Sequence, residues 1–367
     1  MRIAYMLTSL GIGGAEKQAV ALAEHMASNG HAVLLIVLRE PEPEQWPTHL
    51  DTVYLKLRRT PASLFRGLFR VRRAVRAFRP DLVHSHTCPA NLCARVLRLL
   101  GIAPPVVSTI HNVYEGGRLR MLAYRLSDDL ALQCTAVSHE VARCYTERRA
   151  VSARKCAVIA NAIDSATFVS DAARRKQARA ELNAGDDFIW LAVGRLVNAK
   201  GFLNLLQAFS DVWPQFPQTQ LWIAGPAPRS PSARHEYSLF VARKGTMDRV
   251  HRLGLRRDMP ALFDAADAFV LSSSWEGMPL AVGEAMAMEK PIVATDVGGV
   301  REMLADCGTL VPMRDPARLA EAMLEIMRQP AERRAALGRQ ARARVTAHFG
   351  APAHFARWES FYRQLHV

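Results

Sequence analysis

The chain has 367 residues, too many for one ordinary hydrophobic core, so its length predicts two domains. Half of the residues are hydrophobic and 22% are charged, as in a soluble globular protein, and no stretch reaches the roughly 18 to 20 apolar residues of a membrane-spanning helix. The net charge of +14 is unusual and indicates an anionic partner: nucleic acid, anionic lipid or a phosphorylated ligand.

The six cysteines form neither a CxxC pair nor a His-flanked metal pattern. Most have apolar neighbours in the sequence, which favours small core residues in a reducing, cytoplasmic compartment. The first residues, MRIAYMLTSLGIGG, lack the apolar core and cleavage site of a signal peptide and are interpreted as a strand. The cysteines are Cys88, Cys93, Cys134, Cys144, Cys156 and Cys307.

The chain begins with a βαβ pattern: a strand at 3–7, a glycine loop at 11–14, a helix at 15–28 and a strand at 32–38. A dinucleotide site would need a third glycine at position 16, which is Glu16, although Glu40 could mimic a ribose-binding acid. The other interpretation is a loop whose glycines let the backbone approach a phosphate or sugar closely.

A basic segment follows at residues 56–79. One face of its predicted helix carries five apolar residues at helical spacing: Leu64, Leu68, Val71, Val75 and Phe78. No acidic residue lies in the segment, which favours contact with an anionic membrane surface over an ordinary solvated face. Nucleic acid is the disfavoured alternative for this segment. The basic residues are Lys56, Arg58, Arg59, Arg66, Arg70, Arg72, Arg73, Arg76 and Arg79.

Histidines mark the ends of the next two predicted strands, 81–86 and 106–110. His111 is a site candidate because it falls at the same sheet edge as the glycine loop. His84 and His86 are interpreted as strand-end residues that make local hydrogen bonds. Further strands at 131–137 and 157–159, and a turn at 161–164, complete a first domain over residues 1–164. The polar, basic residues 165–185 are interpreted as a linker.

The second domain, 186–345, opens with a strand at 188–193 and a helix at 202–209. Arg195 and Lys200 lie between them, and both could reach one anion, because arginine binds a diphosphate through its planar fork and lysine as a point charge. A plain surface pair near a helix start is the alternative. Another strand is predicted at 220–224, and residues 227–248 form a polar, basic stretch without a clear pattern.

The central candidate site lies between two predicted strands, 268–271 and 291–294. A loop there contains Glu276, and a helix at 280–288 contains Glu284; each carboxylate can accept from a pair of sugar hydroxyls. Pro279 suits the first helical position, and the neighbouring N–H groups at the start of this helix form a ready phosphate site. A solvated loop glutamate and a glutamate favoured near a helix N-terminus are the alternative. Helices at 319–327 and 330–348 follow. A last segment, 355–365, carries Trp358, Phe361, Tyr362 and Leu365 at helical spacing, which requires a surface to pack on.

These motifs together resemble the retaining glycosyltransferases of family 4, over essentially the whole length. The resemblance rests on GIGGAEKQ at 11–18, HSH at 84–86, IHN at 110–112, VIANAID at 158–164, GRLVNAKG at 194–201, EGMPLAVGEAMA at 276–287 and DVGGVREM at 296–303. It implies the GT-B fold, an α/β architecture of two facing Rossmann-like domains with parallel sheets. It also implies that a C-terminal helix, 346–367, crosses back to the first domain and buries Trp358 and Tyr362.

The resemblance also implies roles for single residues. Arg195 and Lys200 would hold the donor diphosphate, Glu284 the ribose hydroxyls, and Glu276 the transferred sugar together with the backbone that follows it. His111 would sit near the anomeric centre, and the expected catalytic residues are His111, Glu276, Arg195 and Lys200. The expected donor-binding residues are Gly13, Gly14, Arg195, Lys200, Glu276, Gly277, Met278, Pro279, Leu280 and Glu284.

The implied activity is transfer of a sugar, with retention, from a UDP-linked donor to a lipid-linked glycan or polysaccharide of the bacterial cell surface, at the inner face of the cytoplasmic membrane. No metal or cofactor is expected, because two cations and helix dipoles would stabilise the leaving diphosphate. A nucleotide-sugar epimerase of the same architecture and a nicotinamide-dependent oxidoreductase remain alternatives. Two departures from the family pattern, Asn161-Ala162 and residues 225–228 (GPAP), affect the interdomain turn and the detail of donor binding.

Overall fold

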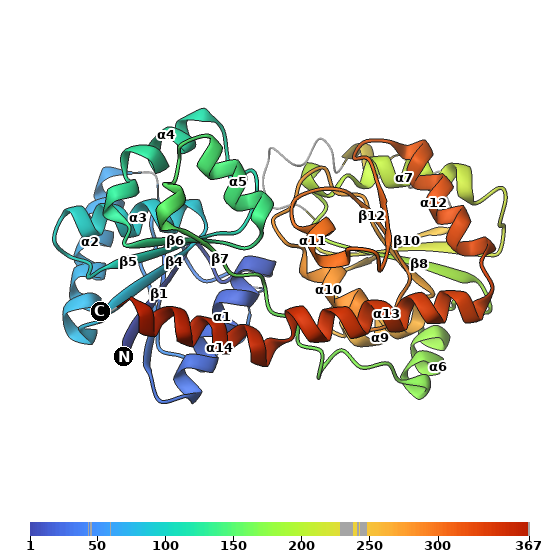
Figure 1. Cartoon of the computed structure of the whole chain (residues 1–367), viewed down its shortest axis with the longest axis horizontal. Coiled ribbons are helices and arrows are strands. Elements are labelled where there is room, and N and C mark those ends of the chain that lie inside the picture. Colours follow the sequence, from blue (N-terminus) through green and yellow to red (C-terminus); the bar gives the residue numbers. More distant parts are fainter. Residues whose placement is uncertain are drawn as a thin grey trace. The chain divides into compact units, whose positions relative to one another are not determined.

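A computed structural model describes residues 1–42, 44, 46–58, 60–227, 238–240, 242 and 248–365. Within these residues the chain divides into two compact units (Figure 1). Unit 1 comprises Met1–Ala162 and Pro352–Val367, and unit 2 comprises Ile163–Ala351. Each unit is built on one parallel sheet, so the expected pair of parallel-sheet α/β domains is confirmed.

The described strands of unit 1 form a seven-stranded sheet in the order β3-β2-β1-β4-β5-β6-β7. Strand β1 is buried after its first residue, and β4 and β5 are buried throughout, as expected for a parallel sheet covered on both faces. The strand order reverses between β1 and β4, and ligands bind beyond the carboxyl ends of strands at such switch points. The strands are β1 (Arg2–Leu7), β2 (Ala32–Val37), β3 (Thr52–Tyr54), β4 (Leu82–His86), β5 (Val106–Ile110), β6 (Gln133–Ala136) and β7 (Cys156–Val158).

The helices of unit 1 cover two faces of this sheet. One apolar cluster joins α1 to the C-terminal helix α14, and a second joins α2 and α3 to the opposite face. Helix α14 lies beside α1 (Figure 1), where Trp358 and Tyr362 are buried, so the predicted return of the last helix to the first domain is confirmed. The helices are α1 (Gly14–Ser28), α2 (Pro61–Phe78), α3 (Cys88–Leu99), α4 (Arg118–Leu126), α5 (His139–Glu147) and α14 (Ala351–Gln364).

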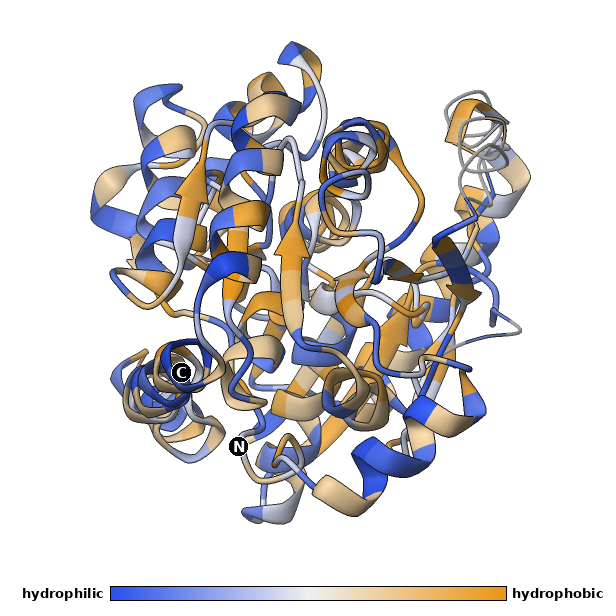
Figure 2. Cartoon of the chain, turned by 90° about the vertical axis from the view of Figure 1, so that its right-hand side faces the viewer, coloured by the Kyte–Doolittle hydropathy of each residue, from blue (hydrophilic) through white to orange (hydrophobic). Residues whose placement is uncertain are grey.

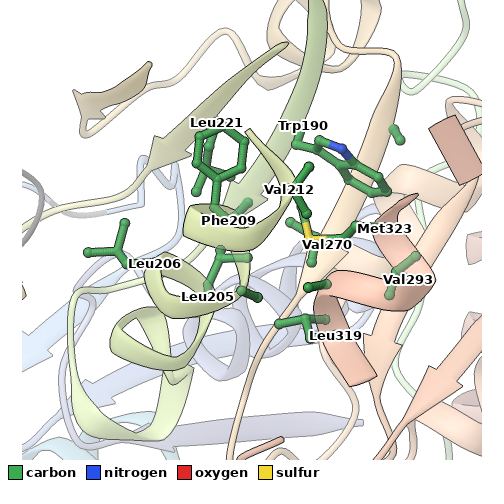
Figure 3. Close-up of a cluster of buried hydrophobic side chains, with 14 of the residues drawn as sticks. Trp190, Leu205, Leu206, Phe209, Val212, Leu221, Val270, Val293, Leu319 and Met323 are labelled. Atoms are coloured by element: carbon green, nitrogen blue, oxygen red, sulfur yellow. The ribbon is translucent and has the colours of Figure 1, made fainter. Parts of the chain in front are cut away.

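Unit 2 has a six-stranded sheet among its described residues, in the order β10-β9-β8-β11-β12-β13. Its order reverses between β8 and β11, which gives a second switch point. The large side chains Trp190, Phe209 and Met323 fill the space between this sheet and helices α7 and α12 (Figure 3). The strands are β8 (Phe188–Val193), β9 (Thr219–Ala224), β10 (Val250–Gly254), β11 (Ala268–Leu271), β12 (Ile292–Thr295) and β13 (Thr309–Val311).

Figure 2 shows most strands coloured as hydrophobic, whereas the helices carry both hydrophilic and hydrophobic residues. Helix α10 packs on α13, and Gly338 permits the close approach, because a Cβ there would lie 2.0 Å from the backbone oxygen of Glu289. The helices are α6 (Ala172–Glu181), α7 (Phe202–Val212), α9 (Met259–Ala265), α10 (Leu280–Ala287), α11 (Val300–Leu304), α12 (Pro316–Arg328) and α13 (Ala331–Phe349).

The structure differs from expectation at residues 165–185. Instead of a linker, this segment belongs to unit 2 and contains α6, which packs on α9. The arginines that suggested a solvated linker are paired with acids of unit 2. Arg174 lies 2.5 Å from the buried Asp264, and Arg175 lies 2.7 Å from the half-buried Asp267. The last helix also begins at Ala351 rather than 346, because α13 continues to Phe349.

Helix α2 carries most of the predicted basic segment. Val71 and Val75 are buried as expected, but Leu64 is 55% exposed, so its assignment to the packing face was wrong. Phe65 and Phe69 are also exposed and contact each other edge to face. The segment has a counter-charge from outside its own sequence, because Arg58 lies 2.6 Å from Glu40. Arg59 lies outside the described residues, as do Pro228 of the GPAP loop and most of the polar stretch at 227–248.

Candidate active site

The charged candidate site of unit 2 lies at its switch point, beyond the carboxyl ends of β8 and β11. Lys200 follows β8 and Glu276 follows β11, and the Lys200 Nζ lies 2.6 Å from the Glu276 Oε1. The same oxygen accepts from the Ser273 hydroxyl at 2.6 Å. Glu276 is 7% exposed, so this carboxylate is held by one cation and one hydroxyl in a largely water-free setting.

Two loops are tied together to create this pair. The Ser272 hydroxyl donates to the Lys200 carbonyl oxygen at 2.9 Å, and the Ser274 N–H donates to the Ala199 oxygen at 2.8 Å. Gly201 has a φ of 60°, and a Cβ there would lie 2.2 Å from the Ser272 oxygen, so the contact requires glycine. The lysine is therefore positioned by the backbone of the opposite loop as well as by its own ion pair.

A second glycine holds the loop that carries Glu276. Gly298 has a φ of 55°, and a Cβ there would lie 2.2 Å from the Glu276 carbonyl oxygen. Its neighbour Gly299 donates its N–H to the Gly277 oxygen at 2.6 Å. The Gly-Gly turn of the DVGGVREM motif therefore packs directly against the loop that carries Glu276.

Helix α10 supplies the other predicted donor-binding residues. Glu284 lies in its second turn and is 8% exposed, and Met278 and Leu280 are buried at its start. Pro279 is the residue before the first helical position rather than the first, so the helix begins at Leu280. The first N–H groups of the helix have no carbonyl partner within it, which gives this end a partial positive charge.

Arg195 follows β8 and is exposed. In the described part of the chain, it makes no hydrogen bond or ion pair with Lys200 or Glu276. The structure thus brings Lys200 and Glu276 together and places Arg195 on the same loop, without joining it to them. Gly194, just before it, lies against the Lys200 side chain, with 3.0 Å between an added Cβ and the lysine Cδ.

In unit 1 the glycine loop leads directly into α1. Gly13 precedes the helix and Gly14 is its first residue. A Cβ on Gly13 would lie 2.2 Å from a carboxylate oxygen of Glu16, and the other oxygen of that group accepts from Ser9 at 3.3 Å. Glu16 occupies the position where a dinucleotide motif would have its third glycine, and its side chain packs against Gly13. Glu40, the possible ribose-binding acid, is exposed and engaged by Arg58, which does not favour a dinucleotide site.

The three histidines at the ends of β4 and β5 belong to one network, in which His84 and His86 are buried. His84 is bonded through Nδ1 to the Tyr362 hydroxyl and through Nε2 to the Thr109 hydroxyl, both at 2.6 Å. Tyr362 in turn contacts the Tyr5 hydroxyl at 3.0 Å. Burial lowers the pKa of His84 to about 3. The local hydrogen bonds predicted for His84 are therefore present, and one of them reaches the C-terminal helix.

His111 lies just beyond β5 and is half-buried, and burial lowers its pKa to about 4. Its Nε2 lies 3.0 Å from the Nδ1 of His86. Its backbone N–H donates to the Glu115 Oε1 at 3.2 Å, and burial raises the pKa of Glu115 to about 7. Glu115 also accepts from the Tyr124 hydroxyl at 3.2 Å.

Sequence reasoning missed Glu115 and Ser273. Glu115 could have been noticed as an acid four residues after a strand-end histidine, just before the Gly116-Gly117 turn. Ser273 stood in a run of three serines, and only the fold shows which of them faces the carboxylate. Throughout the described ranges, no group of three or more His, Cys, Asp or Glu side chains is arranged to hold a metal ion.

Two family models match the chain. Glycosyltransferase Family 4 covers residues 12–167, and Glycosyl transferases group 1 covers residues 173–344. The UDP-Gal:alpha-D-GlcNAc-diphosphoundecaprenol alpha-1,3-galactosyltransferase of Escherichia coli is 26% identical over 67% of this chain and 66% of its own length. The chain thus spans just under two thirds of that relative. The lipopolysaccharide core biosynthesis glycosyltransferase LpsD of Rhizobium meliloti is 26% identical over 88% of this chain and 87% of its own.

Solved structures share the architecture over nearly the whole chain. The Anabaena protein HepE, in a crystal structure with UDP-glucose, aligns with a TM-score of 0.85 at 19% identity, covering 99% of this chain and 100% of that one. At this identity, the likeness shows a common fold.

Proposed function

The chain belongs to the family 4 glycosyltransferases, with the GT-B fold, and on this premise we propose that it transfers a sugar, with retention, from a UDP-linked donor to a lipid-linked glycan or polysaccharide. The observation that carries the proposal is the Lys200–Glu276–Ser273 arrangement at the switch point of unit 2. The names of two relatives, a galactosyltransferase that acts on a diphosphoundecaprenol-linked sugar and a lipopolysaccharide core glycosyltransferase, support the choice of acceptor. The UDP-glucose complex of HepE supports the choice of nucleotide.

The proposed donor site uses charge in two ways. Arg195 and Lys200 bind the diphosphate, and Glu284 accepts from the ribose hydroxyls. Lysine has three N–H donors, so Lys200 can keep its bond to Glu276 while it donates to a phosphate oxygen. Glu276 has a second oxygen, Oε2, for hydroxyls of the transferred sugar. The backbone at residues 277–280 and the positive end of α10 complete the anion site.

In the proposed reaction, the acceptor hydroxyl attacks the anomeric carbon from the same face as the one from which the diphosphate leaves. The bond from that carbon to the diphosphate oxygen breaks, the new glycosidic bond forms, and the hydroxyl proton passes to the departing phosphate. The products are the glycoside and UDP. The residues of the chain stabilise the negative charge that develops on the diphosphate and hold the reactants in position.

The nucleotide is tested first, by thermal shift. The full chain is heated with UDP, GDP, ADP or NAD, and then with the nucleotide-sugars that match the best ligand. We expect UDP to raise the melting temperature and NAD to leave it unchanged. Stabilisation by NAD but not by UDP would favour an oxidoreductase and overturn the proposal. Conversion of the nucleotide-sugar without any acceptor would instead indicate an epimerase.

The acceptor proposal includes a peripheral site on an anionic membrane, at the cytoplasmic face. None of the described helices is both long and apolar enough to cross a membrane. Helix α2 offers exposed arginines next to the exposed Phe65 and Phe69, the combination that binds the boundary between lipid headgroups and acyl chains.

Vesicle sedimentation tests this part. At low salt, we expect the chain to bind vesicles rich in anionic lipid, and replacement of Arg72, Arg73 and Arg76 by Glu to weaken binding at least about tenfold. The control variant replaces three exposed arginines of unit 2, Arg257, Arg333 and Arg339, by Glu, with the same change in net charge. An equal loss in both variants would show a general charge effect and remove α2 as the binding surface.

A further inference from the structure

The contact between His86 and His111 constrains where their protons lie. His86, at the end of β4, is 2% exposed, and its Nδ1 lies 3.0 Å from the Nε2 of His111. Burial lowers the pKa of His86 well below its ordinary value and that of His111 to about 4, so both rings are neutral at pH 7. Each ring then carries a single N–H, and only one of the two facing nitrogens can be the donor.

The two possible arrangements differ in what they leave buried. If His111 donates from Nε2, then His86 must carry its own proton on Nε2. That atom is buried and has no hydrogen-bond partner among the described residues. The nearest ring, His84, lies 4.1 Å away between centroids, and both of its nitrogens are already bonded to Tyr362 and Thr109. A buried N–H without an acceptor is the rarer and costlier defect.

If His86 donates from Nδ1, no N–H is buried without a partner. His111 then carries its proton on Nδ1. From this geometry we infer that His86 is a positioning residue, which fixes His111 in the Nδ1–H tautomer so that His111 presents a hydrogen-bond donor to the substrate. The inference rests on the proposed function for the statement that His111 meets the substrate; the tautomer itself does not depend on it.

The backbone around both histidines is held in place. Thr87, directly after His86, has a φ of 72°, which is costly for a threonine, and its hydroxyl contacts that of Thr8 at 2.7 Å. The His111 N–H is bound by Glu115, whose carboxyl group is the titratable neighbour on the loop after β5. The imidazole of His111 is therefore oriented from two sides, through its ring by His86 and through its backbone by Glu115.

The tautomer has a chemical consequence. With Nε2 accepting from His86 and Nδ1 protonated, neutral His111 has no free lone pair with which to remove a proton from the acceptor hydroxyl. It can donate to an oxygen of the transferred sugar or of the leaving phosphate. This assignment agrees with a reaction in which the phosphate takes the acceptor proton, and it excludes His111 as the general base.

The test is the tautomer of His111 in the full chain, measured by nitrogen-15 NMR of the histidine-labelled protein at pH 7.5, with signals assigned by comparison with His111→Gln. We expect a protonated Nδ1 and an unprotonated Nε2. His86→Leu, which has no donor, should shift His111 toward the Nε2–H form and lower kcat about 10- to 100-fold, with the dissociation constant of UDP unchanged. His86→Asn, which can donate through its amide, should restore both readings.

A protonated Nε2 on His111 in the unsubstituted protein would overturn the inference, and so would a leucine variant whose His111 spectrum is unchanged. If His86→Leu does not fold, the spectrum of the unsubstituted protein still decides. Failure of the proposed function looks different: the expected tautomer would be seen, but no variant would bind UDP or turn over a UDP-sugar.

Discussion

The two switch points of the chain are built on the same sheet architecture but carry different chemistry. In unit 2 the residues after β8 and β11 form a charged pair, Lys200 and Glu276, closed by the Ser273 hydroxyl. In unit 1 the residues at the ends of β4 and β5 are imidazoles, whose pKa values are lowered by burial. One edge therefore keeps its charges by pairing them, and the other avoids charge by burying groups that can become neutral.

This difference indicates a division of labour in the proposed reaction. A diphosphate carries negative charge into its site, and fixed cations and a helix N-terminus suit it. A sugar hydroxyl is neutral and is better served by directed hydrogen bonds from neutral groups. The same fold thus supports two kinds of recognition, because the loops after the strands, and not the strands, determine the chemistry.

The charged edge should show the largest effect. We expect Lys200→Ala to lower kcat/KM for sugar transfer about 100- to 1,000-fold, because the variant loses a cation aimed at the leaving diphosphate. Steady-state kinetics with the UDP-sugar found in the binding screen measures the loss. The matched control is Lys176→Ala, which removes an exposed lysine of α6 in the same unit; near-normal activity of the Lys200 variant would remove this residue from the site.

A second variant separates catalysis from folding. Lys200→Ala leaves the buried Glu276 carboxylate with Ser273 but without its cation, which could lower stability as well as activity. In Lys200→Ala combined with Glu276→Gln, the unpaired charge is gone. We expect the melting temperature of the double variant to recover, whereas activity should stay low.

Glu284→Ala sharpens the assignment of the donor nucleotide. The variant loses a buried carboxylate in α10 that is proposed to accept from the ribose hydroxyls, so UDP should bind about 10- to 100-fold more weakly. Isothermal titration calorimetry measures the change. Glu325→Ala, at an exposed position of α12, serves as the control. Unchanged affinity for UDP would place the ribose elsewhere.

Much of the fold could be predicted because its strands are continuous apolar runs that end in glycine or polar loops. The strands at 106–110, 188–193 and 268–271 were predicted at their observed bounds. The short strands β3 and β13 were missed, since three residues carry little periodicity. The arginines of helix α6 predict a solvated linker from sequence alone, and only their tertiary contacts with Asp264 and Asp267 show a packed helix.

The candidate site could be predicted in part. The loops that follow β8 and β11 were located from motif spacing, and the structure joins Lys200 to Glu276 directly. The pairing itself could not be predicted, because the two residues are far apart in the sequence and meet through the parallel pairing of β8 and β11. For the same reason, the burial that raises the pKa of Glu115 could not be predicted, because no local pattern reveals it.

The neutral edge of unit 1 is sensitive to single hydroxyl groups. Tyr362→Phe removes the atom that bonds to both Tyr5 and His84, leaving two buried polar groups short of a partner. We expect the free energy of unfolding to fall by about 2 kcal/mol, measured by urea denaturation. Tyr114→Phe, at a tyrosine that is 54% exposed, is the control. A loss no larger than that of the control would mean that the network does not help to hold α14.

Glu115→Gln tests whether the edge of unit 1 is truly kept neutral, and its effect depends on pH. Burial raises the pKa of Glu115 from 4.5 to about 7, so the folded chain binds this proton more tightly than the unfolded chain does. Its contribution to stability is present below pH 4.5 and is lost as the pH rises through 7. The histidines act oppositely: the pKa of His84 is lowered to about 3 and that of His111 to about 4, so their contribution is lost as the pH falls below 6.5.

Glu115→Gln should therefore remove the loss of stability that Glu115 causes as the pH rises, and leave the pH dependence that comes from the histidines unchanged. The quantity compared is the unfolding free energy of Glu115→Gln minus that of the unsubstituted protein. Because Glu115 is partly exposed, we expect this difference to rise by only about 1 kcal/mol from pH 5 to pH 8. Urea unfolding at four pH values in this range measures the difference. Glu147→Gln, at an exposed position of α5, is the control for loss of a surface carboxylate. A difference that stays constant with pH would show that Glu115 is ionised in the folded chain, so that the edge beside His111 is not neutral.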